Sequence, residues 1–145
     1  MSSIPTARFG TLMAHQPISL VDRRVLVVED EYLIAMEMAH CLRAEGAEIV
    51  GPVANAKQAL ALIEAGPLDA AVLDVNLRGE AVYEVADRLC ERRVPYLFAT
   101  GEVLIEDRSD YRSRPKLEKP MLGTELLLAV RRLIGTSHGS TSGIP

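Results

Sequence analysis

Carboxylates follow two short apolar runs of this chain, at positions where a folding role is hard to find for them. Asp74 ends the run Ala70 to Leu73, and Glu29 and Asp30 directly follow a Val-rich run. A short apolar run of this kind is typical of a strand buried on both faces of a parallel sheet. Ligands in such sheets bind just outside the carboxyl ends of the strands. Asp74 is therefore a candidate for chemistry, although by itself it could equally be a turn former or a helix cap.

A hydroxyl, an accessible backbone amide and an ammonium stand at two further strand ends. Thr100 and Gly101 follow one apolar run, and Lys119 follows a very short one. Three carboxylates packed together would repel one another, and a divalent cation such as Mg²⁺ removes that conflict. These groups suit an acyl phosphate formed on Asp74, with Lys119 neutralising charge and Thr100 holding a phosphoryl oxygen.

Five repeats of strand followed by helix would place these side chains. The predicted strands are 24–28, 48–53, 69–74, 96–100 and 117–118. The predicted helices are 32–45, 55–65, 81–92, 103–111 and 124–134, with Asn55 capping the second and Gly46 ending the first. This alternation predicts an α/β fold with a parallel sheet, right-handed crossovers and helices on both faces. The strand exits then share one edge of the sheet.

Length and composition indicate one globular domain. The chain has 145 residues, of which 48% are hydrophobic and 25% charged. We expect a flexible N-terminal arm over 1–22, a folded domain over 23–135 and a disordered tail over 136–145. Apolar residues of the arm, including Ile18 and Leu20, could dock on the domain.

Several function classes are disfavoured by the same composition. The net charge of -4 argues against a nucleic-acid partner. No apolar run is long enough to span a membrane, and no signal peptide is recognisable, so a cytoplasmic location is expected. Cys41 and Cys90 have no zinc-ligand spacing and are interpreted as reduced core thiols, and Met36 and Met38 as packing residues.

Four motifs in order resemble the response-regulator receiver domain of two-component signalling. They are Val-Val-Glu-Asp-Glu (27–31), Leu-Asp-Val-Asn-Leu (73–77), Phe-Ala-Thr-Gly (98–101) and Glu-Lys-Pro (118–120). The resemblance covers 24–135 and implies a flavodoxin-like (βα)5 doubly wound sheet with strand order 2-1-3-4-5.

The resemblance also implies a role for each matching residue. Asp74 would accept the phosphoryl group, and Thr100 and Lys119 would bind it. Mg²⁺ would be held by Asp30, by Asp74, by the backbone carbonyl of Asn76 and, mostly through water, by Glu29. The side chains of Asn76 and Glu102 would tune dephosphorylation, and the Lys119-Pro120 peptide would be cis.

A narrower resemblance is to the single-domain regulators of the FAT GUY group, carried by Pro-Tyr-Leu-Phe-Ala-Thr-Gly (95–101) and Pro-Lys-Leu-Glu-Lys-Pro (115–120). Two positions depart from that group, since Glu102-Val103-Leu104 and Met121 stand where aromatic residues are common. Typical receivers also carry an aromatic residue three positions before the Lys, and here it is Lys116. We therefore expect residues 102–115, rather than a Thr–aromatic pair, to change on phosphorylation.

These observations predict a stand-alone response regulator. It would take a phosphoryl group from a sensor histidine kinase or a histidine phosphotransfer protein, with Mg²⁺, and relay it, drain it or bind a downstream protein. It would not be a conventional enzyme, although phosphotransfer and dephosphorylation would be self-catalysed. The alternatives are a phosphate-independent binding module on the same fold and a haloacid-dehalogenase-like phosphatase. The phosphatase is disfavoured because Asn76 stands where a second acid would be needed.

Overall fold

A five-stranded parallel sheet forms the centre of the computed structural model, which describes residues 18–75, 77, 82–100, 115–119 and 123–142. The strand order is β2-β1-β3-β4-β5, as predicted for a flavodoxin-like fold. The strands are β1 (Arg24–Val28), β2 (Glu48–Val53), β3 (Ala70–Asp74), β4 (Tyr96–Thr100) and β5 (Lys116–Glu118).

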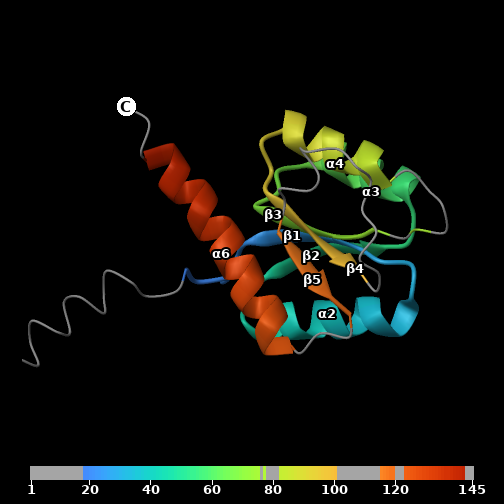
Figure 1. Cartoon of the computed structure of the whole chain (residues 1–145), viewed down its shortest axis with the longest axis horizontal. Helices are drawn as coiled ribbons and strands as arrows, with labels where there is room; N and C mark the ends of the chain where they lie inside the picture. The colour runs from blue at the N-terminus through green and yellow to red at the C-terminus, as the bar shows by residue number, and fades with distance from the viewer. Residues whose placement is uncertain (1–17, 76, 78–81, 101–114, 120–122, 143–145) are drawn as a thin grey trace, which may run out of the picture.

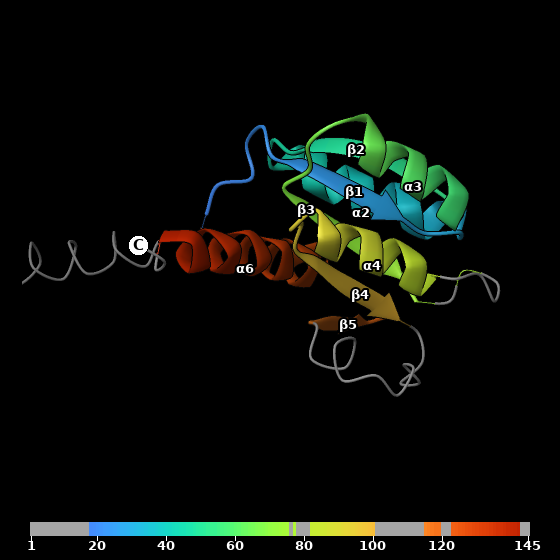
Figure 2. The same cartoon turned by 90° about the horizontal axis from the view of Figure 1, so that it is seen from above.

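Two pairs of helices cover the two faces of this sheet (Figures 1 and 2). One pair is α2 (Tyr32–Ala44) with α6 (Gly123–Ser142), and the other is α3 (Ala56–Ala65) with α4 (Val82–Glu91). The helix expected over 103–111 lies outside the described residues. The fold is thus the predicted three-layer α/β arrangement.

The central strands are buried on both faces because each face has its own helix pair. In β1, Val25 and Val27 pack in the cluster with α2 and α6, whereas Leu26 and Val28 pack in the cluster with α3 and α4. All five residues of β3 are buried. This explains why the strands appear in the sequence as continuous apolar runs rather than as alternating ones.

The packed structure begins before residue 23, where the predicted arm was expected to end. Leu20 is only 1% exposed and belongs to the core cluster of α2 and α6, and Ile18 packs against that cluster. A turn holds this entry in place, since the Arg23 N–H donates to the Leu20 carbonyl and the Asp22 N–H to the Gly46 carbonyl. Burial of Leu20 removes a large apolar side chain from water, and this stabilises the folded state.

Local signals fix the ends of two helices as predicted. The Asn55 side chain accepts a hydrogen bond from the Gln58 N–H at 2.8 Å and caps α3. Gly46 follows α2 with a φ of +94°, and a Cβ there would lie 2.8 Å from a Val21 methyl group. The α6 helix, in contrast, was expected to end at Ile134 and continues to Ser142. No Pro occurs between these residues to stop it.

Three side chains expected in the core lie nearer the surface. Cys90 is exposed and Cys41 only partly buried, and neither of these two described residues forms a disulfide. Cys90 follows Leu89 in sequence and so stands outside the apolar stripe of α4. Met38 is buried as predicted, but Met36 is 39% exposed on the outer side of α2. No described helix combines the length and apolarity needed to cross a membrane.

Candidate functional site

The parallel register brings the acidic residues to one edge of the sheet. Val28 of β1 is the partner of Leu73 in β3, so the residues that follow them, Glu29 and Asp74, leave the sheet at the same level. Both are buried although both carry a carboxylate. Asp30 is partly buried beside them. The pairing of adjacent parallel strands therefore brings residues from separate sequence motifs together in one cluster.

Three carboxylates meet in that cluster. One oxygen atom from each of Glu29, Asp30 and Asp74 lies within 4.8 Å of the other two. Glu29 Oε2 accepts a hydrogen bond from the backbone N–H of Glu31 at 3.2 Å. This bond directs Glu29 into the cluster rather than outward along the chain.

Lys119, just after β5, places its ammonium against two of these carboxylates. Its Nζ lies 2.7 Å from Glu29 Oε1 and 3.3 Å from Asp74 Oδ1. Burial acts to lower the pKa of Lys119, but Glu29 and Asp74 together outweigh it and hold the pKa above its ordinary value. Lys119 is therefore a fixed positive charge beside Asp74.

The cluster has the donor chemistry of a site for a hard divalent cation. Its ligand atoms are all carboxylate oxygens, the type that Mg²⁺ prefers. Within the described residues, three carboxylates surround the Lys119 ammonium, which is ion-paired with Glu29 and Asp74. Glu29 Oε1 is buried, and although it is ion-paired it lacks a hydrogen bond of normal angular geometry within the described part of the chain. A bound cation would offset the negative charge of the carboxylates and would coordinate this oxygen.

The structure places some of the remaining predicted site residues and not others. Thr100 ends β4, where its backbone pairs in register with Glu118. The Asn76 carbonyl, Gly101, Glu102 and the Lys119-Pro120 peptide lie outside the described residues. Glu29, Asp30, Asp74 and Lys119 are thus brought together, while the predicted contacts of Thr100 and Asn76 stay predictions.

An exposed apolar surface beside the cluster was not anticipated. Tyr32 and Leu33 are 73% and 80% exposed at the start of α2, one turn above Met36. A signal for it was present, since apolar residues at 32, 33, 34, 36 and 38 point in too many directions for one buried stripe. We refer to Tyr32, Leu33 and Met36 as the α2 patch.

The strand order and the position of the carboxylates define a doubly wound α/β protein with an acidic site at the carboxyl edge of its sheet. A family model described as the response regulator receiver domain matches residues 25–131. The chain belongs to this family.

Curated relatives and solved structures agree with that assignment. The transcriptional regulatory protein PdtaR of Mycobacterium tuberculosis is 33% identical over 114 residues, which are 76% of this chain and 56% of the relative. The chain spans about half the length of the curated relatives it matches.

Two of the similar solved structures bear on the site. The BeF3-activated conformation of SdrG from Pseudomonas melonis Fr1 is 43% identical with a TM-score of 0.63, covering 74% of this chain and 93% of that one. The receiver domain of the sensor histidine kinase PA1611 from Pseudomonas aeruginosa PAO1 is 27% identical with a TM-score of 0.68, covering 79% and 99%. The latter is described with a magnesium ion coordinated in its active-site cleft.

Proposed function

We propose that this protein accepts a phosphoryl group on Asp74 from a histidine kinase or a histidine phosphotransfer protein, in a reaction that requires Mg²⁺. It would then relay the group, lose it by hydrolysis or signal through protein contacts. One observation carries the proposal. The buried Asp74 carboxylate lies in an acidic cluster and 3.3 Å from the Lys119 ammonium.

The chemistry follows from the position of Asp74. A carboxylate oxygen attacks the phosphorus of the donor, a new O–P bond forms, and the P–N bond to the donor imidazole breaks. The leaving imidazole keeps the bonding electron pair and takes a proton from solvent. Lys119 balances the negative charge that is concentrated at the phosphoryl oxygens, and the hydroxyl of Thr100 is expected to donate to one of them.

The cation has a defined place in this proposal. Glu29, Asp30 and Asp74 would hold Mg²⁺, joined by the Asn76 carbonyl as the family resemblance implies. When bound, Mg²⁺ supplies positive charge at the phosphoryl oxygens. The residues themselves bind and orient: the Glu31 amide holds Glu29, and Asp74 is held in a buried position beside Lys119.

The α2 patch gives a protein donor a place to dock. Its apolar side chains lie directly after Glu29, Asp30 and Glu31 in the chain, so a protein bound there would reach the acidic cluster. Apolar side chains this exposed are common at protein contact sites. A donor that carries its phosphohistidine beside an apolar surface would match this patch.

Intact-mass spectrometry after incubation with acetyl phosphate and Mg²⁺ tests the proposal. The wild-type chain should gain the mass of one phosphoryl group, and EDTA should abolish the gain. Asp74→Asn should gain none, whereas Asp87→Asn, at an exposed position on α4, should behave as wild type. If wild type and Asp74→Asn both stay unmodified with Mg²⁺ present, the fold serves as a phosphate-independent binding module instead.

A further inference from the structure

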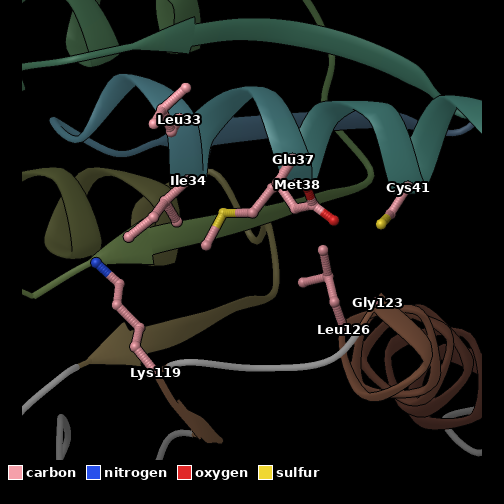
Figure 3. Close-up of a pocket in the computed structure, with 8 residues that line it drawn as sticks. All are labelled: Leu33, Ile34, Glu37, Met38, Cys41, Lys119, Gly123 and Leu126. Carbon is pink, nitrogen blue, oxygen red and sulfur yellow. The ribbon is translucent and has the colours of Figure 1, made fainter.

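A cavity of 260 Å³ lies between α2 and α6, next to the acidic cluster. Figure 3 shows Ile34 and Met38 of α2 and Leu126 of α6 lining it, with the stem of Lys119 at one end and Cys41 at the other. Met38 and Leu126 also belong to the core cluster of this face. The cavity is therefore an opening in an apolar layer that no described side chain fills.

The charged side chains that line the cavity are Glu37 and Lys119, and the Lys119 ammonium is ion-paired with Glu29 and Asp74. Glu37 places its carboxylate on the wall, and Glu31 is exposed at the start of the same helix. Beside them stand the apolar side chains of the α2 patch. An occupant that suits this surface would be apolar with positive charge and would carry no carboxylate of its own.

The described chain starts beside α6, the helix that forms one wall of the groove between α2 and α6 in which the cavity lies. Ile18 lies against α6, where a Cβ added at Gly135 would be 3.1 Å from it. The helix from Gly123, at the cavity, to Gly135 is about 18 Å long. The stretch from Leu12 to Ile18 spans about 20 Å when extended, so residues near position 12 can reach the cavity.

Residues 1–17 have the composition that the groove requires. They include the apolar residues Phe9, Leu12 and Met13, together with Arg8, and they contain no Asp or Glu. The next residues continue the same pattern, since Ile18 and Leu20 already pack in the apolar layer between α2 and α6. The segment is tethered to α6 about 18 Å from the cavity, which keeps its effective concentration there high.

We propose that residues 8–13 bind in the groove between α2 and α6, with Leu12 or Met13 in the cavity and Arg8 near the acidic side chains of α2. This inference rests on the proposed function for its consequence. A segment bound there would cover part of the surface next to the α2 patch and compete with a protein donor, while acetyl phosphate would still reach Asp74. The N-terminal segment would thus act as a built-in competitor of phosphoryl donors.

The two cysteines provide a test that needs neither metal nor phosphoryl donor. Cys41 lines the cavity, and Cys90 is exposed on α4 across the sheet. Alkylation by iodoacetamide is followed at both thiols by mass spectrometry, in the full chain. The pKa of the Cys41 thiol is raised, first by burial and then by Glu37, so all chains are compared at one alkaline pH.

The variant is the full chain with Phe9→Ser, Leu12→Ser and Met13→Ser, and the matched control carries Ser2→Ala, Ser3→Ala and Thr6→Ala. Cys41 alkylation should become at least about threefold faster in the first and stay unchanged in the second, with Cys90 constant in both. Equal Cys41 rates in all chains would overturn the proposal. A faster Cys41 reaction accompanied by a lower urea midpoint of the variant would also overturn it, because it would report general loosening of the fold. Protection of Cys41 that is lost on dilution would assign the groove to a second copy of the chain.

Discussion

Replacing Lys119 by Met should destabilise the protein far more than loss of an ordinary surface charge. The side chains of Glu29 and Asp74 are 0% and 4% exposed, and Lys119 is 13% exposed between them. Met keeps most of the apolar stem but removes the ammonium. The buried carboxylates of Glu29 and Asp74 would then lose the ammonium that is ion-paired with both of them.

The size of the effect follows from the burial of the pair. Removing one partner of a buried ion pair costs about 3–5 kcal/mol, because the remaining charge is left without compensation. The lower end applies here, since Asp30 is only partly buried and leaves a route for water. With an m-value of about 2 kcal/mol/M, a loss of about 3 kcal/mol lowers the urea midpoint by about 1.5 M.

Urea unfolding in EDTA, followed by circular dichroism, measures this loss. Arg88→Met is the matched control, because its guanidinium forms a 2.6 Å ion pair with Glu64 on the surface and water screens such a pair. Adding Mg²⁺ should restore part of the stability of Lys119→Met, since a bound cation can replace the missing charge. If both variants lose equally little in EDTA, Lys119 does not hold the buried carboxylates together and the electrostatic account of the site is wrong.

Four further outcomes are expected. Asp30→Asn should weaken Mg²⁺ binding at least about tenfold by calorimetry, and an unchanged affinity would remove Asp30 from the metal site. Leu20→Ala should lower the free energy of unfolding, measured with urea, by about 2–4 kcal/mol. A loss below about 1 kcal/mol would show that Leu20 belongs to a loosely held arm and not to the core. Amide exchange over 102–115 should change on adding beryllofluoride; changes confined to other segments would mean that another element responds. Folding raises the pKa of Lys119 above its ordinary value of 10.5, so its ion pairs contribute their full stability below pH 10.5. The free energy of unfolding should fall as the pH rises through the higher pKa of the folded state, and Lys119→Met should lack this fall.

The sequence was sufficient to predict the sheet because its strands are buried on both faces. β1, β2 and β4 occupy the predicted residues, and the order of all five agrees with the resemblance. Asn55 and Gly46 act through short-range backbone geometry, which is visible in the sequence. Leu20 could not be assigned, since its burial depends on a distant helix pair rather than on its neighbours in the chain.

The candidate site was predictable as a set of residues but not as an electrostatic arrangement. Strand ends pointed to Glu29, Asp30, Asp74 and Lys119, because parallel strands bring their exits to one edge. That the Lys119 ammonium lies nearer Glu29 than Asp74 depends on side-chain packing after folding. The α2 patch could not be predicted for the same reason. The sequence showed more apolar residues than one buried stripe needs, but it did not show which of them would be exposed.

The position of the phosphoryl group tests the central claim most directly. After reaction with acetyl phosphate and Mg²⁺, sodium borohydride reduces an acyl phosphate on Asp to homoserine, which peptide mapping locates. The account predicts homoserine at position 74 in the donor-treated chain and none when EDTA replaces Mg²⁺. Homoserine at position 30 in place of position 74 would contradict it, as would 2-amino-5-hydroxypentanoic acid, the reduction product of a phosphorylated Glu, at position 29. An adduct that resists borohydride and maps to a Ser or His would contradict it as well.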